Sequence, residues 1–200
     1  MKLRQTWTAV RALLIMSCVL GIGYPLAVTA VGQLALPAQA NGSLLTVDGE
    51  VVGSSLIGQS FTDAEGAALP EWFQSRPSAA GDGYDGRASS GSNYGPENDD
   101  LIAAIGDRQA AIEALDVTGQ LNSSDIPADA VTASASGLDP HISPEYALLQ
   151  VARVAEARGI PEAEVRELVE SRIQGRDLGY LGEPTVNVLE LNIALMELDG

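Results

Sequence analysis

Histidine, cysteine and lysine each occur once in this 200-residue chain, and their scarcity limits the chemistry it could perform. His141 is the only imidazole that could activate a serine, and no G-x-S-x-G motif presents a nucleophile. Cys18 allows no intrachain disulfide and no multi-cysteine zinc site. Lys2 alone provides no phosphate-binding loop and no serine–lysine pair. Catalysis would therefore depend on carboxylates and hydroxyls.

Three sequence patterns could still carry chemistry, and each has a simpler structural interpretation. Asp82, Asp85, Glu97, Asp99 and Asp100 could surround calcium or sodium, but their spacing matches no known calcium loop, so we favour a solvated acidic face. The segment 116–119 (DVTG) has the spacing of the phosphorylated D-K-T-G signature without its lysine, which disfavours phosphorylation. For His141, a pH-sensitive or ligand-contacting role competes with a structural role in its loop, which we favour.

The charge balance excludes one class of partner. The chain has 11 Lys and Arg against 27 Asp and Glu, which gives a formal charge of −16. Beyond residue 11 only eight arginines face all 27 acids, so the remainder carries −19. Nucleic-acid binding requires cations that neutralise phosphates, and we therefore expect no nucleic-acid partner.

An uncharged apolar stretch near the amino terminus predicts a membrane anchor. Residues 12–32 contain no charge, and a helix of this length would span about 31 Å, close to the hydrocarbon thickness of a bilayer. The cations that precede it predict a cytoplasmic amino terminus. Ala38-Gln39-Ala40 resembles a signal cleavage site, but the apolar stretch is longer than a signal requires, so we favour an uncleaved anchor. The predicted organisation is residues 1–11 cytoplasmic, 12–34 transmembrane and 35–200 extracytoplasmic.

Small and helix-perturbing residues within the span predict a packing surface. Pro25 removes a backbone donor, so Tyr24-Pro25 should kink the helix or mark a contact. Gly21 and Gly23 would allow another transmembrane helix to approach closely. Ordinary membrane sequence explains the same residues equally well.

The rest of the chain predicts one α+β domain with an aliphatic core, short strands, long Gly/Ser-rich loops and several helices. Asp48-Gly49 predicts a hairpin turn between two strands within 44–61. Residues 74–98 and 125–143 are typical of loops by composition. Helices are predicted over 99–115, from Ser143-Pro144 to Gly159, from Pro161 towards Gly175 and over 189–198, after a strand-like segment at 185–188.

The two irregular segments resemble one family, the C subunit of the Kdp-type potassium-transporting P-type ATPase. Residues 76–98 (RPSAAGDGYDGRASSGSNYGPEN) are similar to its R-P-S-A and S-G-x-S-N-x-G-P-x-N blocks. Residues 127–159, which include VTASASGLDPHIS, and residues 182–195 (GEPTVNVLELNIAL) also match. Tyr94 departs from the leucine that the family often has. The resemblance covers nearly the whole chain.

The resemblance implies a non-catalytic accessory subunit in the plasma membrane of a prokaryote. Implied partners are a potassium-binding channel-like subunit, an ATP-hydrolysing pump subunit and a very small single-span subunit. The chain itself would bind no cofactor stably, and ATP would act through the pump subunit. Interface candidates come from the matching blocks: Arg76, Pro77, Ser78, Ser92, Asn93, Gly95, Pro96, Asn98, Thr132, Ser134, Ser136, Asp139 and His141.

Two mechanisms and one alternative function remain open. The family is described as raising the ATP affinity of the pump subunit, with Gln59 a candidate residue, yet the predicted topology separates Gln59 from cytoplasmic ATP by about 30 Å of bilayer. The other mechanism is electrostatic, because a domain of charge −19 would concentrate potassium ions at an uptake path. The alternative function is a free-standing extracytoplasmic hydrolase or binding module that uses His141 and the serine-rich loops.

Overall fold

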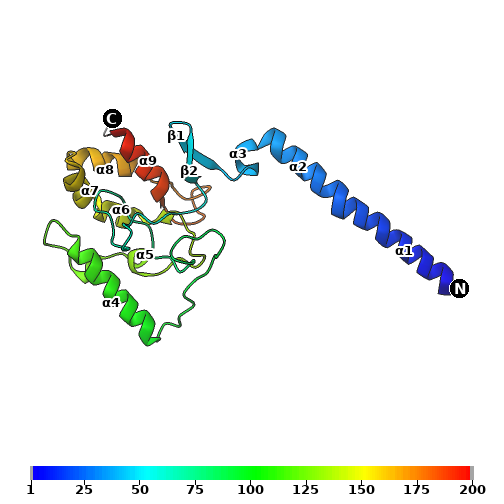
Figure 1. The fold of residues 1–200 in the computed structure, drawn as a ribbon, viewed down its shortest axis with the longest axis horizontal. Helices are drawn as coiled ribbons and strands as arrows, with labels where there is room; N and C mark the ends of the chain where they lie inside the picture. Colours follow the sequence, from blue (N-terminus) through cyan, green and yellow to red (C-terminus); the bar gives the residue numbers. More distant parts are fainter. Residues whose placement is uncertain (1, 199–200) are drawn as a thin grey trace. The chain divides into compact units, whose positions relative to one another are not determined.

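A computed structural model describes residues 2–198 of the chain. The polypeptide divides into two compact units, Met1–Leu45 and Thr46–Gly200. The first unit contains helix α1 (Lys2–Cys18), a π-helical turn η1 (Val19–Gly23), α2 (Tyr24–Ala35) and α3 (Pro37–Ala40). The first three are continuous, and the helix Leu3–Ala35, which contains an 18-residue stretch of mean hydropathy 2.0, is long enough to cross a membrane (Figure 1).

The π-helical turn lies directly before Tyr24-Pro25, where the sequence predicted a kink or a contact. Pro25 has no N–H to donate, and the helix widens just before it, so that the Tyr24 N–H bonds to the carbonyl of Val19, five residues back. Gly23 and Tyr24 keep helical backbone angles. A Cβ added at Gly21 would meet nothing within 4 Å. Packing of this surface against another helix stays a prediction.

Two short sheets come after the apolar helix in the sequence. Strands β1 (Leu44–Val47) and β2 (Glu50–Ser54) pair through the predicted turn, where Asp48 and Gly49 have φ of 51° and 83°, as a type I′ turn requires. Strands β3 (His141–Ile142) and β4 (Val186–Asn187) pair antiparallel, with His141 opposite Asn187. The hairpin prediction is confirmed.

The helices after strand β2 are α4 (Asp99–Ala114), the 3₁₀ turn η2 (Ser123–Asp125), α5 (Ala128–Val131), α6 (Pro144–Leu149), α7 (Val151–Arg158), α8 (Glu162–Ser171) and α9 (Val188–Leu198). Helix α6 begins after the predicted cap Ser143, whereas α5 lies within 125–143, which was predicted to be a loop. The Ser143 hydroxyl accepts a bond of 3.0 Å from the Tyr146 N–H, and Gly159 ends α7 with φ of 68°. The α+β class is confirmed.

Three element boundaries differ from the sequence prediction. The helix expected from Ser143 to Gly159 is broken at Gln150, whose N–H bonds only three residues back to Ala147. Helix α8 ends at Ser171, before Gly175, where the Arg172 N–H bonds three residues back to the carbonyl of Val169. The last strand is short because Asn187 accepts a bond from the Glu190 N–H and so starts α9.

The core is aliphatic, as the composition predicted. Helix α8 packs against α6, α7 and α9, and Val151, Val154, Val165, Leu191 and Leu195 are fully buried (Figure 1). Two aromatic rings join them: Tyr146 of α6, and Phe73, which lies in an irregular segment and is fully buried. A loop residue therefore helps to fill the core.

Side chains of the helices satisfy the backbone of that buried loop. Asn192 accepts from the Phe73 N–H and donates to the Phe73 carbonyl, both at 3.0 Å. Gln150 makes the same pair of bonds with Gln74, at 2.7 and 3.2 Å. Arg153 donates to the carbonyls of Pro70 and Trp72 at 2.6 and 3.1 Å, and its burial lowers its pKa. We call residues 69–75 with these three side chains the loop clamp.

Replacing Asn192 with Ala should destabilise the domain by about 3 kcal/mol, because it leaves the buried N–H and C=O of Phe73 without partners. Chemical denaturation of the full chain in detergent measures the change. The control Gln120→Ala alters an exposed amide and should change stability by less than about 0.5 kcal/mol. Equal unfolding midpoints for both variants would contradict the role of the clamp.

Candidate interaction site

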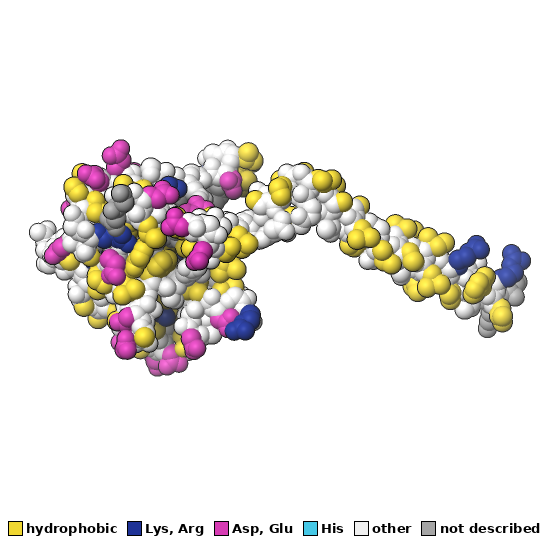
Figure 2. Space-filling model, turned by 45° about the horizontal axis from the view of Figure 1, so that its top comes forward, with side chains coloured by type: hydrophobic (Ala, Val, Ile, Leu, Met, Phe, Trp, Pro, Cys, Tyr) yellow, Lys and Arg dark blue, Asp and Glu magenta, His cyan; other side chains and the backbone are white. Residues whose placement is uncertain are grey.

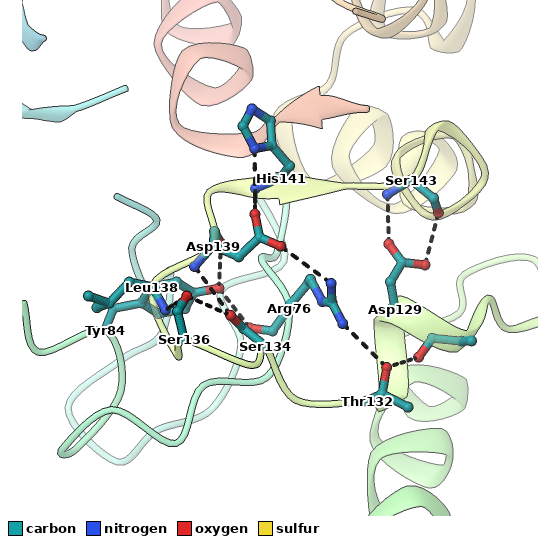
Figure 3. A network of polar contacts seen from close by, with 11 residues as sticks. Arg76, Tyr84, Asp129, Thr132, Ser134, Ser136, Leu138, Asp139, His141 and Ser143 are labelled. Carbon is teal, nitrogen blue, oxygen red and sulfur yellow. Dashed lines mark hydrogen bonds and ion pairs between the residues drawn. The ribbon is translucent and has the colours of Figure 1, made fainter. Parts of the chain in front are cut away.

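The two irregular segments, 74–98 and 125–143, are far apart in the sequence but meet in a polar network, shown in Figure 3. Within the second segment, the Asp139 N–H donates to the Ser134 hydroxyl at 3.3 Å, and the Leu138 N–H to the Ser136 hydroxyl at 3.1 Å. The Ser134 N–H donates to the carbonyl of Pro77 at 2.9 Å, which joins the two segments. Short polar side chains thus replace regular secondary structure as partners of the backbone.

Arg76 connects the network to α5. Its guanidinium lies 3.3 Å from Asp139 Oδ2 and 3.5 Å from Thr132 Oγ1 (Figure 3). Burial alone would raise the pKa of Asp139, but hydrogen bonds from the side chain and backbone of His141, with the charge of Arg76, lower it below its usual range. Asp139 is therefore ionised and accepts hydrogen bonds from both Arg76 and His141.

Tyr84 and Ser78 hold the first segment in place. The Tyr84 hydroxyl donates to the carbonyl of Arg76 at 2.9 Å, and burial raises its pKa to about 12, which keeps it a donor. Ser78 Oγ donates to the carbonyl of Gly137 at 2.6 Å and accepts from the Tyr84 N–H at 2.9 Å. Tyr84 was not among the predicted site residues; the available signal was one of only two aromatic residues in a Gly/Ser-rich loop.

Glycine permits the close approach of the two segments. Gly137 has φ of 69°, and a Cβ there would lie 2.5 Å from the carbonyl oxygen of Ser90. A Cβ at Gly58 would lie 2.4 Å from the Tyr84 ring, and one at Gly91 would lie 2.7 Å from the carbonyl oxygen of Ala135. The network therefore depends on positions without a side chain as much as on its polar groups.

Two hollows in the domain share Arg76. One, of about 460 Å³, is lined by residues that include Arg76, Ser78, Tyr84 and Arg108. The other is an open hollow of about 490 Å³ beside Ser134 and Asp139. Arg76 Nε is buried and has no hydrogen-bond partner among residues 2–198. Arg108 donates to the carbonyl of Val131 at 2.7 Å.

The structure brings together part of the predicted interface set. The residues that lie in or beside the network are Arg76, Pro77, Ser78, Thr132, Ser134, Ser136, Asp139 and His141. Residues Ser92, Asn93, Gly95, Pro96 and Asn98 lie on the chain leading into α4. Asn98 caps α4 by accepting from the Asp100 N–H at 2.7 Å, and Asn93 bonds the carbonyl of Gly91. A role for either group at an interface stays a prediction.

The remaining sequence patterns have local structural roles. Asp116 accepts bonds from the N–H groups of Thr118, Gln120 and Leu121, each at 3.0 Å, and the Leu121 bond first, then those from Thr118, lowers its pKa to about 2. His141 lies with Nδ1 3.5 Å from Asp139. Within the described residues, no three His, Cys, Asp or Glu side chains gather at a metal-binding distance.

A helix long enough to span a membrane, together with a compact α+β unit, fits the class of single-pass membrane proteins. The family described as "K+-transporting ATPase, c chain" matches residues 6–197, and the chain belongs to this family. It is therefore a subunit of a potassium-transporting ATPase complex, which implies partner subunits.

Individual relatives carry the same description. A potassium-transporting ATPase KdpC subunit from Kineococcus radiotolerans is 56% identical over 193 residues, which cover 96% of this chain and 93% of the relative. The subunit from Caulobacter vibrioides is 55% identical over 177 residues, or 88% and 84% of the two chains. The subunit from Mycobacterium tuberculosis is 50% identical over 196 residues, or 98% and 99%. The family resemblance inferred from the sequence is confirmed.

Gly137→Ala should separate the two loops and destabilise the domain by about 3 kcal/mol or more, because it combines left-handed strain with overlap on the backbone of Ser90. The matched control is Gly119→Ala, where φ is 65° but a Cβ meets nothing within 4 Å. That variant should lose only about 1 kcal/mol. Thermal unfolding of both variants measures the difference, and equal losses would show that the close approach contributes nothing.

Proposed function

We propose that the chain is a non-catalytic accessory subunit that crosses the plasma membrane of a prokaryote once, with its amino terminus in the cytoplasm and its domain outside. It assembles with a potassium-binding channel-like subunit, an ATP-hydrolysing pump subunit and a very small single-span subunit. It binds no cofactor stably, and ATP acts at the pump subunit. Family membership supports the role as a subunit.

One observation carries the non-catalytic assignment: the polar groups of the network are engaged in holding loops. Asp139 accepts from Arg76 and His141, while Ser134 and Ser136 bond backbone N–H groups. A serine hydrolase would instead need a serine hydroxyl paired with the imidazole. This arrangement favours a rigid contact surface over the alternative of a free-standing hydrolase.

Gln59 is also engaged within the domain, which bears on the ATP-affinity mechanism. The side-chain amide of Gln59 donates to the carbonyl of Val52 at 2.7 Å, and the backbone carbonyl of Gln59 accepts from the Ser75 hydroxyl at 2.9 Å. These bonds support a structural role for Gln59, so any effect on ATP affinity would act indirectly through the assembled complex. We favour attraction of potassium ions as the direct contribution of the domain.

The distribution of acids supports that contribution. Asp82, Glu97, Asp99 and Asp100 are exposed, and Asp85 is half-buried. Figure 2 shows Asp and Glu side chains spread over the visible face of the domain instead of in one patch. Such a surface raises the local cation concentration without holding any one ion, and salt weakens the effect because it shortens the screening length from about 30 Å at 0.01 M to about 8 Å at 0.15 M.

Affinity purification of a carboxyl-tagged chain tests the assembly. Membranes from cells grown at limiting potassium should yield the tagged chain together with a pump ATPase and a multi-span potassium subunit after mild detergent extraction. Mass spectrometry identifies the proteins that copurify. Recovery of the tagged chain alone, while those subunits are present in the same membranes, would overturn the accessory role.

Replacing Asp82, Asp85, Asp99 and Asp100 together with Asn should raise the apparent KM of potassium uptake at least about twofold at low ionic strength, and the difference should vanish at high salt. The control replaces Glu162, Glu164, Glu167 and Glu170 of α8 with Gln, which removes the same charge from another surface and so separates the effect of the loop acids from that of net charge. Uptake is measured at fixed potassium with an inert salt. An unchanged KM in the loop variant would exclude steering by these acids.

A further inference from the structure

The hairpin between α8 and β4 carries three apolar side chains into solvent. Leu178 is 83% exposed, Tyr180 69% and Leu181 49%. Val51, Val52, Leu56 and Ile57 form another group of exposed apolar residues, around β2, whereas Ile102 on α4 has no such neighbour within four positions. Isolated apolar residues are normal on a protein surface, but a cluster of three at the end of a hairpin marks an interaction site. We call residues 177–182 the apolar tip (orange-brown in Figure 1).

Hydrogen bonds hold the apolar tip in one conformation. Asp177 and Leu181 exchange two backbone bonds of 2.9 Å, and Gln174 and Thr185 pair below them at 2.8 and 3.0 Å. An ion pair between Arg176 and Glu183 crosses the hairpin. The tip is therefore fixed before it meets any partner, which lowers the entropy lost on binding.

The backbone at Leu178 is unfavourable for leucine. Leu178 has φ of 53° and Gly179 has φ of 83°, so both occupy the left-handed region. Glycine adopts this conformation freely and asparagine often does, whereas leucine is disfavoured there. The position thus combines backbone strain with an exposed apolar side chain, which is the reverse of what stability of the domain alone would favour.

We propose that the apolar tip inserts into an apolar recess on a membrane-embedded partner subunit of the pump. This inference rests on the proposed function, since it requires an assembled complex. A protein recess is favoured over lipid for two reasons. The chain beyond residue 11 carries a formal charge of −19, which an anionic bilayer surface repels, and a preformed tip suits a shaped recess better than a fluid headgroup layer.

The tip itself has the composition of an interface anchor. Residues 178–182 (LGYLG) contain no charged side chain, and the N–H groups of Gly179, Tyr180 and Leu181 are bonded to carbonyls within the hairpin. Tyr180 combines a large apolar ring with a hydroxyl, as residues at the centre of protein interfaces often do. A recess lined by apolar side chains on the outer face of the partner fits this chemistry.

The variant Leu178→Asn tests the contact with the partner without destabilising the fold. Asparagine relieves the left-handed strain, so the unfolding midpoint of the full chain should stay equal or rise, while the apolar contact is lost. The chain should then dissociate roughly tenfold faster from the detergent-solubilised pump complex. The control Ile102→Asn removes a 59% exposed apolar residue from α4 and should dissociate like the wild type.

The outcomes distinguish this inference from the proposed function. Wild-type dissociation kinetics for Leu178→Asn, in a preparation where the wild type copurifies with the pump, overturn the tip inference alone. A wild type that copurifies with no pump subunit overturns both. A photoreactive amino acid at position 180 gives a second test in native membranes: an adduct with a membrane-embedded pump subunit supports the inference, and an adduct with lipid only, or none, overturns it.

Discussion

The domain depends on one requirement: backbone N–H and C=O groups that leave water must find partners. Its two described sheets have two strands each, so they cannot provide those partners for the long irregular segments. Side chains do so instead. Asn192 and Gln150 each pair with both backbone groups of one loop residue, and Arg153 gathers several carbonyls. The buried ring of Phe73 can contribute to the core because its backbone is satisfied in this way.

In the polar network, side chains also satisfy backbone groups of irregular segments, but these side chains come from different elements. In the loop clamp the partners come from helices, whereas in the network serine, aspartate and tyrosine side chains of the loops bond each other's backbone. Glycine at 58, 91 and 137 lets these loops approach to backbone contact. Both sets of loops are therefore held in place without extensive strands.

Sequence reasoning succeeded where the cause is local. Asp48-Gly49, Ser143 and Gly159 act on residues within four positions, so the hairpin and the helix ends could be predicted. It failed where the cause is distant. Asn192 lies 119 positions from Phe73 and Gln150 lies 76 from Gln74, so neither the clamp nor the break in the helix at Gln150 leaves a signal in the local pattern. The left-handed Leu178 was missed because leucine gives no reason to expect it.

The π-helical turn at Val19–Gly23 also changes how the anchor's surface must be interpreted. One inserted residue rotates everything after it by about 100° relative to an uninterrupted α-helix. Side chains seven positions apart across the turn, such as Ser17 and Tyr24, do not share the face that a regular helical wheel would assign them. Faces that a regular helix would align on α1 and α2 consequently point in different directions around the helix axis. A single membrane segment can therefore present two separate contact faces to two neighbours.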